Sequence, residues 1–292
     1  MANLKYLDSL NKSQKEAVLY ISGPLLIVAG AGSGKTKVLT SRIAHILKEN
    51  KAFPNQILSV TFTNKAAREM QNRVSKILEN KEVGLPWLGT FHSICAKILR
   101  RHAKAVNLKE NFTIIDQDDQ SRLIKSICSA ENIDIKKISP NFIMSLINKW
   151  KNLGWYPNDV VLKKSDSLEK NLLKIYRIYQ SKLTGLNACD FGDLILHCVS
   201  IFEKNLDINK MYSKNFRYIL VDEYQDTNFI QSKWLKLLTK SHDNICCVGD
   251  DDQSIYSWRG AEIKNFLEFD KIYNNTKIIR LEENYRSTQN IL

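Results

Sequence analysis

The sequence lacks any hydrophobic run that approaches the roughly 18 apolar residues of a membrane-spanning helix. Its first residues, Met-Ala-Asn-Leu-Lys-Tyr, also lack the apolar core of a secretory signal peptide. Internal repeats and low-complexity segments are absent as well. These absences argue against a membrane protein, a secreted protein and a repeat array, and they predict a cytoplasmic protein.

Paired cysteines are missing too. The chain has six cysteines, and none of them stand at the paired spacing of a metal site: Cys95, Cys128, Cys189, Cys198, Cys246 and Cys247. Most of them lie within apolar patterns, so we expect buried, reduced thiols rather than disulfides or metal ligands.

Acidic residues are too few to balance the basic ones. The 43 Lys and Arg against 31 Asp and Glu give a formal net charge of +12. Such an excess favours a polyanionic partner such as nucleic acid. Solvated lysines in a lysine-rich proteome would explain the same composition. The length of 292 residues, with 43% hydrophobic and 25% charged residues, predicts a globular chain with a sizeable core in one large domain or two ordinary ones.

One stretch of the chain predicts a phosphate-binding loop. An apolar run leads into Ala29-Gly30-Ala31-Gly32-Ser33-Gly34-Lys35-Thr36, and a helical pattern follows it. In a loop of this kind, backbone N–H groups and the positive end of the helix converge on phosphate. Lys35 is expected to reach the β- and γ-phosphates, and the Thr36 hydroxyl is expected to bind Mg²⁺. Ala29 replaces the first glycine of the usual pattern, G-x-x-x-x-G-K-[ST].

Apolar strands alternate with helical patterns on both sides of an unusual central block. The expected strands after the loop are Ile57–Phe62, Trp87–Phe91, Phe216–Val221, Ile245–Val248 and Lys277–Leu281. The alternation predicts an α/β fold with a parallel sheet, whose site lies at the carboxyl edge of the strands. From about residue 116 to residue 202, strand signals become scarce and helical periodicity dominates, which predicts a helical insertion.

Polar residues that follow the expected strands Phe216–Val221, Ile245–Val248 and Lys277–Leu281 complete a candidate catalytic site. Asp222 is expected to hold Mg²⁺ opposite Thr36, and Glu223 to act as general base toward the attacking water. Gln253 is expected to orient water or contact the γ-phosphate, and Arg286 to place positive charge on the phosphoryl oxygens. The alternatives are a helix-capping acidic pair, a surface amide and a surface arginine.

These motifs together resemble the N-terminal motor of superfamily 1 DNA helicases of the UvrD/Rep/PcrA group. The resemblance covers nearly the whole chain, and the runs Val-Asp-Glu-Tyr-Gln-Asp-Thr-Asn and Val-Gly-Asp-Asp-Asp-Gln-Ser-Ile-Tyr-Ser-Trp-Arg-Gly are long enough to be specific. The matching blocks, in the family's order, are Leu10–Val18 (Q motif), Ala29–Thr36 (motif I), Val60–Met70 (Ia), Gly89–Ser93 (Ib), Leu220–Asn228 (II), Val248–Glu262 (III) and Leu281–Thr288 (IV).

The resemblance implies a RecA-like P-loop NTPase with a parallel sheet and an all-helical insertion domain. We expect a discontinuous ATP-binding domain at residues 1–110 and 203–283, the insertion at 111–202, and the start of a second motor domain at 284–292. The family's second RecA-like domain, with motifs V and VI, is missing from these residues. An N-terminal fragment of this kind should bind ATP and Mg²⁺, hydrolyse ATP weakly, and not unwind DNA without the C-terminal motor half.

The resemblance also implies roles for individual residues in the nucleotide site. Gln14 would read the adenine base, and Tyr285 would stack on its ring. Gln253 would couple the γ-phosphate to DNA, and Arg286 would contact that phosphate. Lys37 stands where close relatives often carry arginine, which weakens a bidentate phosphate contact. The nucleotide-binding set is Gln14, Ala29, Gly30, Ala31, Gly32, Ser33, Gly34, Lys35, Thr36, Lys37, Tyr285 and Arg286.

The same resemblance implies a track for single-stranded DNA. Aromatic rings would stack on bases, and hydroxyl or cationic groups would hold the backbone. Core packing is the alternative for Trp258. The expected DNA contacts are Phe62, Asn64, Thr90, His92, Tyr256, Trp258 and Arg259.

The favoured interpretation is the first motor domain of an ATP-dependent 3′-to-5′ DNA helicase of repair or replication, acting on single-stranded DNA and duplex junctions. Repair or replication proteins are expected as further partners. A helicase remnant that holds DNA or a partner protein without turnover is one alternative, and the helicase subunit of a helicase–nuclease complex is another. DNA-stimulated ATP turnover would exclude the first alternative, and a nuclease motif downstream would support the second.

Overall fold

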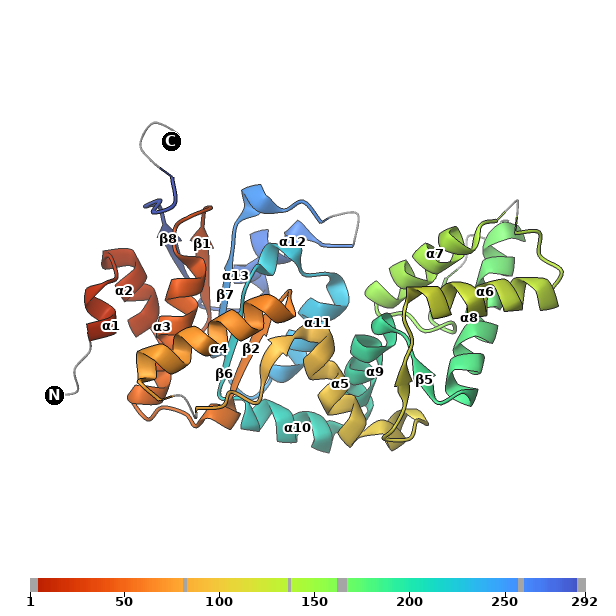
Figure 1. Cartoon of the computed structure of the whole chain (residues 1–292), viewed down its shortest axis with the longest axis horizontal. Coiled ribbons are helices and arrows are strands. Elements are labelled where there is room, and N and C mark those ends of the chain that lie inside the picture. Colours follow the sequence, from red (N-terminus) through yellow and green to blue (C-terminus); the bar gives the residue numbers. More distant parts are fainter. Residues whose placement is uncertain (1–4, 81–82, 136–137, 162–166, 257–259, 288–292) are drawn as a thin grey trace. The chain divides into compact units, whose positions relative to one another are not determined.

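The computed structural model describes residues 5–80, 83–135, 138–161, 167–256 and 260–287 of the chain (Figure 1). Its contacts divide the chain into two compact units. The sheet unit comprises Met1–Ile94, Leu206–Asn228 and Leu235–Leu292, and the helical unit comprises Cys95–Asn205 and Phe229–Trp234. The contacts thus begin the helical unit at Cys95 rather than at residue 111, and they add a short segment that the sequence had placed in the ATP-binding domain.

The sheet unit is built on six strands in the order β3-β2-β6-β7-β1-β8. Every described pair of neighbours is parallel, so the predicted parallel sheet is confirmed and all the strands end at one edge. The strands are β1 (Leu25–Ala29), β2 (Ile57–Thr61), β3 (Leu88–Thr90), β6 (Tyr218–Val221), β7 (Ile245–Gly249) and β8 (Lys277–Leu281).

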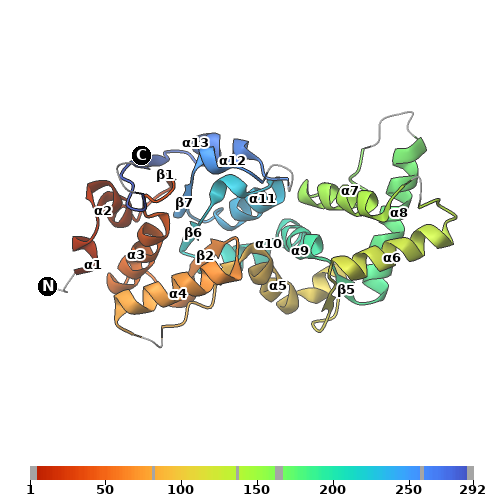
Figure 2. The same ribbon diagram turned by 45° about the horizontal axis from the view of Figure 1, so that its top comes forward.

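Helices cover both faces of this sheet. From β1 the chain moves one way along the sheet to β2 and β3, and from β6 it moves the other way to β7 and β8. Because such crossovers are right-handed, α3 and α4 cover one face, and α12 and α13 the other. Figures 1 and 2 show this arrangement, with α12 and α13 fainter behind the sheet in Figure 1. The helices of this unit are α1 (Lys5–Asp8), α2 (Lys12–Leu19), α3 (Lys35–Lys48), α4 (Asn64–Leu78), α10 (Leu206–Asn215), α12 (Ile263–Leu267) and α13 (Phe269–Ile272).

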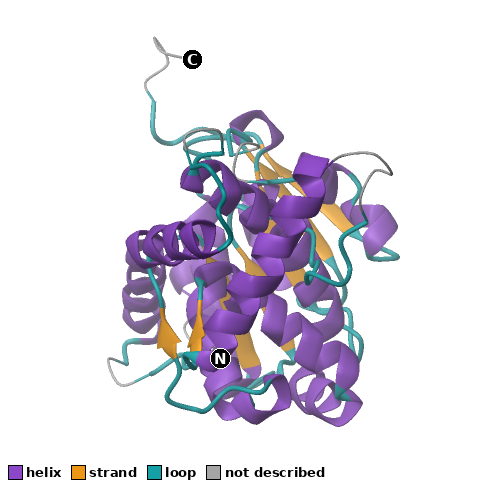
Figure 3. Cartoon of the chain, turned by 90° about the vertical axis from the view of Figure 1, so that its right-hand side faces the viewer, coloured by secondary structure: helices purple, strands orange, loops and turns teal. Residues whose placement is uncertain are grey.

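The helical unit follows the predicted periodicity. Its apolar positions, among them Ile124, Ile147, Trp150 and Leu172, form a core of their own. Among the described residues of the insertion, the strands form one short parallel pair, β4 with β5, which the sequence did not predict (Figure 3 shows the strands in orange). Its elements are β4 (Thr113–Ile114), α6 (Gln117–Ala130), α7 (Pro140–Asn152), α8 (Ser167–Gly185), β5 (Ala188–Cys189) and α9 (Phe191–Lys204). Two further helices, α5 (Phe91–Arg101) and α11 (Phe229–Leu238), contain residues of both units.

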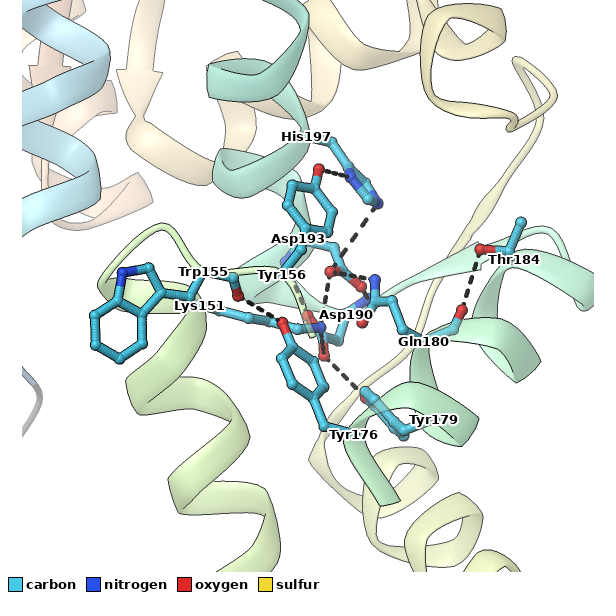
Figure 4. Close-up of polar contacts among 10 residues, drawn as sticks. All are labelled: Lys151, Trp155, Tyr156, Tyr176, Tyr179, Gln180, Thr184, Asp190, Asp193 and His197. Atoms are coloured by element: carbon cyan, nitrogen blue, oxygen red, sulfur yellow. Dashed lines mark hydrogen bonds and ion pairs between the residues drawn. The ribbon is translucent and has the colours of Figure 1, made fainter. Parts of the chain in front are cut away.

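A buried ionic cluster ties α7, α8 and α9 together within the helical unit (Figure 4). The Lys151 side chain is 0% exposed, and its Nζ lies 2.6 Å from Asp190 Oδ2 and 2.7 Å from Asp193 Oδ1. From α8, the Tyr179 hydroxyl donates to Asp190 at 2.9 Å and the Gln180 amide donates to Asp193 at 2.8 Å. The cluster therefore joins three helices around one ammonium group that is paired with two carboxylates.

The structure also bears on the state of the cysteines and on the presence of membrane-spanning helices. All six cysteines are buried and free, as predicted. In the described part of the chain, no helix is both long and apolar enough to cross a bilayer.

Candidate functional site

The glycine-rich loop joins the end of β1 to the start of α3, at the carboxyl edge of the sheet. Gly32 and Gly34 have φ values of +77° and +91°, a left-handed conformation that glycine adopts without steric cost. The loop is also closely packed on two sides. A Cβ on Gly34 would lie 2.8 Å from Gln14 Nε2, and one on Gly32 would lie 2.6 Å from Asn284 Oδ1. Glycine is therefore required at both positions, for conformation and for space.

The ammonium group of Lys35 is buried beside this loop and incompletely bonded. The side chain is only 11% exposed, and its Nζ lies 3.5 Å from Glu223 Oε2. Among the described residues, Nζ has no hydrogen-bond partner. A buried cation with unbonded N–H donors can bind an anion, and phosphate oxygens would supply the missing acceptors.

The acidic pair lies at the end of β6, where the chain turns sharply. Glu223 has φ +50° and ψ +45°, a left-handed conformation that is uncommon for a residue with a side chain and that often occurs at functional sites. Burial and the charge of Glu223 raise the pKa of Asp222 to about 7, although the Glu223 N–H donates to Asp222 Oδ1 at 3.1 Å. The same two causes raise the pKa of Asp226 to about 6. This concentration of negative charge would be relieved by a bound cation.

A divalent cation at this point would need ligands beyond carboxylates. The described residues contain no group of three or more His, Cys, Asp or Glu side chains arranged to hold a metal ion. Mg²⁺ commonly binds through one or two protein oxygens, with water and substrate phosphates completing its shell. A carboxylate at Asp222 together with the Thr36 hydroxyl fits that requirement.

The segment after β8 lies against the glycine-rich loop. The backbone N–H of Tyr285 donates to Gly32 O at 3.0 Å, and the Asn284 amide donates to Ala31 O at 2.9 Å. The Tyr285 ring is more than half exposed, while its hydroxyl is bonded to the side chains of Asn11 and Glu283. The structure thus places Tyr285 beside the glycine-rich loop. Stacking on adenine stays a prediction.

The side-chain amide of Gln14, which is predicted to bind adenine, is hydrogen-bonded to protein groups at both ends. Its side chain is buried, its Nε2 donates to Ser33 O at 2.9 Å, and its Oε1 accepts from the Asn11 N–H at 3.2 Å. The amide therefore supports the glycine-rich loop, and reading adenine would require these bonds to be exchanged. Lys37 also has a protein partner, because its ammonium donates to the carbonyl of Ser9.

The predicted DNA contacts fall near the ends of β2 and β3. Phe62 and Asn64 are exposed, and the Phe62 ring packs edge-on against Phe91 with 6.1 Å between ring centroids. The Thr90 hydroxyl accepts from the Ser93 N–H at 3.2 Å, so it caps the start of α5. Burial lowers the pKa of His92.

The remaining predicted DNA contacts lie in the segment after β7. The structure describes Tyr256 as partly buried. Trp258 and Arg259 lie outside the described residues. Contact with DNA stays a prediction for the whole set.

Sequence reasoning gave no role to Gln225, which lies between the acidic pair and β7. Its amide donates to Glu223 Oε2 at 2.9 Å and accepts from the Asp250 N–H at 3.1 Å. Asp250 in turn accepts a hydrogen bond from the Gln253 amide, so the structure links Gln253 to Glu223 through protein groups. The only signal in the sequence was that Gln225 lies within a matching motif.

A glycine-rich loop between an interior strand and a helix, with an acidic pair at the end of another parallel strand, defines a P-loop NTPase domain. Residues 10–274 match the family model described as "UvrD/REP helicase N-terminal domain". The chain belongs to this family.

Curated relatives agree with this assignment. The chain is 48% identical over 295 residues to a probable DNA helicase II homolog of Rickettsia conorii, and this match covers 100% of the chain and 45% of the relative. It is 50% identical over 298 residues to DNA helicase II of Rickettsia typhi, covering 100% of the chain and 44% of the relative. It is 47% identical over 284 residues to the ATP-dependent DNA helicase PcrA of Staphylococcus epidermidis, covering 97% of the chain and 39% of the relative. The chain thus spans less than half the length of these relatives.

Proposed function

We propose that this chain is the ATP-binding motor unit of an ATP-dependent 3′-to-5′ DNA helicase, which moves on single-stranded DNA in repair or replication. The names of the relatives support the DNA helicase assignment. The observation that carries the nucleotide site is the buried Lys35 ammonium, which lies 3.5 Å from Glu223 and lacks a hydrogen-bond partner among the described residues.

The residues of the site divide the work of ATP hydrolysis. The loop from Ala29 to Thr36 offers backbone N–H groups to the phosphates, and Lys35 offers its free donors. Thr36 and Asp222 would hold Mg²⁺, which when bound neutralises charge on the phosphate oxygens. Glu223 accepts a proton from the attacking water. Gln253 and Arg286 act on the γ-phosphate, while Gln14 and Tyr285 bind the adenine.

DNA would bind along the loops that follow β2, β3 and β7. The exposed Phe62 ring can stack on a base, and Asn64 can hold the backbone. The excess of basic residues, +12 overall, favours binding to DNA phosphates. We propose single-stranded DNA at a duplex junction as the macromolecular ligand, repair or replication proteins as further partners, and the cytoplasm as the location.

ATP binding and hydrolysis can be measured separately to test this function. Binding of a fluorescent ATP analogue with Mg²⁺ should be lost in Lys35→Ala, because the cation that faces the phosphates is removed. Glu223→Gln should bind the analogue but not hydrolyse ATP, because only the base is lost. Lys174→Ala is the control, since this lysine is exposed and pairs with Glu131 in the helical unit. Single-turnover hydrolysis with protein in excess resolves even slow rates.

Two results would contradict this function. Unchanged nucleotide affinity in Lys35→Ala would exclude the glycine-rich loop and Lys35 as the nucleotide-binding site. With the C-terminal motor half supplied, a rate that saturating single-stranded DNA does not raise would instead favour the helicase remnant that binds without turnover.

A further inference from the structure

Gln225 lies in the short turn after β6 and is almost completely buried. Its side chain is 1% exposed, and both ends of its amide are bonded. Nε2 donates to Glu223 Oε2 at 2.9 Å, and Oε1 accepts from the backbone N–H of Asp250 at 3.1 Å. A carboxylate can only accept and a backbone N–H can only donate, so these partners fix the orientation of the amide.

The end of β7 is shaped around this amide. A Cβ on Gly249 would lie 2.5 Å from Gln225 Oε1 and 2.7 Å from Phe266 Cε2. Both neighbours are buried, so a side chain at position 249 would have to displace at least one of them. Gly249 therefore allows the backbone of β7 to approach the amide closely.

The Glu223 carboxylate, which accepts a hydrogen bond from Gln225, has few other contacts among the described residues that fix its position. Glu223 has a left-handed backbone conformation that few side-chain-bearing residues adopt. Its Oε2 also faces Lys35 Nζ at 3.5 Å, which is an ion pair without a hydrogen bond. Of these two contacts to Glu223 Oε2, the one from the Gln225 amide is shorter, at 2.9 Å, and it is a hydrogen bond.

We infer that Gln225 is a positioning residue, which aims the Glu223 carboxylate and joins it to the loop after β7. This inference rests on the proposed function, in which Glu223 is the general base. The connection runs from Glu223 through the Gln225 amide to the Asp250 backbone, and from the Asp250 carboxylate to Gln253. A displacement of the loop that carries Gln253 would therefore move the base. The loop that is predicted to sense the γ-phosphate thus controls the geometry of hydrolysis.

Substitution of Gln225 by methionine tests this role, because methionine has a similar length but makes neither hydrogen bond. Gln71→Met is the matched control. Its amide, on α4, is also bonded at both ends: Nε2 donates to Val83 O at 2.6 Å and to Ser75 Oγ at 3.3 Å, and Oε1 accepts from the Leu85 N–H at 3.2 Å. Each variant is assayed for fluorescent ATP affinity, for the single-turnover rate of hydrolysis, and for the midpoint of urea unfolding.

We expect Gln225→Met to hydrolyse ATP roughly 10- to 100-fold more slowly, with its ATP affinity within about twofold of the wild type. Gln71→Met should keep both. Gln225→Asn, whose amide is one methylene too short to reach both partners, should lose rate in the same direction and is tested in case the methionine variant does not fold.

Three outcomes would overturn the inference. The first is a rate within twofold of the wild type in Gln225→Met or in Gln225→Asn. The second is a rate loss matched by an equal loss of ATP affinity, which indicates general damage to the site. The third is an absence of hydrolysis in the unsubstituted chain, which refutes the proposed function before any substitution is made.

Discussion

Replacing Lys151 by methionine should destabilise the helical unit more than any surface change. The Lys151 ammonium lies within 2.7 Å of both Asp190 and Asp193, and all three side chains are at most 1% exposed. Removing it leaves two carboxylates buried together without a cation. Breaking a buried ion pair in this way costs about 3–5 kcal/mol. The remaining bonds from Tyr179 and Gln180 do not neutralise the charge.

The loss should depend on pH. Burial and the charge of Asp193 already raise the pKa of Asp190 above its ordinary value, and removal of the Lys151 charge raises it further. At pH values between the pKa of Asp190 in the unfolded variant and its higher pKa in the folded variant, the folded state binds more protons than the unfolded state. Stability of the variant therefore falls as pH rises through that window. The Lys151→Met loss should be smaller at pH 5 than at pH 8.

Amide hydrogen exchange in α7, α8 and α9 measures this loss where it occurs. A cost of about 3–5 kcal/mol corresponds to roughly 10²- to 10⁴-fold lower protection. Lys174→Met is the matched control, because the Lys174 side chain is 61% exposed and its ion pair with Glu131 should contribute about 0–1 kcal/mol. The triple variant Lys151→Met, Asp190→Asn, Asp193→Asn should recover part of the loss. Equal losses in Lys151→Met and Lys174→Met at pH 8 would refute the reasoning.

Three further changes have clear expected results. Gly32→Ala should cost about 1–2 kcal/mol from its left-handed conformation alone, and the collision with Asn284 should also weaken binding of a fluorescent ATP analogue; wild-type affinity and melting temperature would contradict this. Tyr285→Ala should weaken ATP binding by roughly 2- to 10-fold while Tyr285→Phe, which keeps the ring, stays near the wild type; equal affinities of the two variants would exclude stacking. Burial lowers the pKa of His197, so the unfolded state binds more protons near pH 6 and stability should fall as pH drops from 7 to 5; His197→Gln should reduce that slope in urea titrations, and an unchanged slope would refute this origin.

Most of the sheet could be predicted from the sequence because β1, β2, β6 and β7 are short, largely apolar runs. β6 and β7 are fully buried parallel strands of this kind, and their ends carry Asp222 and Asp250. The order of the strands could not be predicted, because it depends on which crossovers pack together rather than on local pattern. The two-residue strands β4 and β5 are too short to give any periodicity.

The residue types of the candidate site could be predicted, but their bonding could not. The sequence indicates Lys35, Glu223 and Gln14 by their motifs, but it does not show that Gln14 is bonded to the loop at Ser33. Contacts such as that of the Asn284 amide with Ala31 join residues 253 positions apart, and no local pattern reports them. No sequence pattern indicates Gln225 either, since its significance lies in a bond to Asp250, which follows β7.

Lys151 and Lys35 both have buried ammonium groups, and their surroundings show how a structural cation differs from one available for binding. Lys151 has two carboxylate oxygens within 2.7 Å, so its ammonium is neutralised and hydrogen-bonded. Lys35 has one carboxylate at 3.5 Å and no hydrogen bond among the described residues. Leaving a buried donor unbonded is costly, so such a group is retained where another molecule supplies the bond. Residue type and burial alone would rank the two lysines together. The number of acceptors within bonding distance separates them, and it supports the proposal that Lys35 binds an anion.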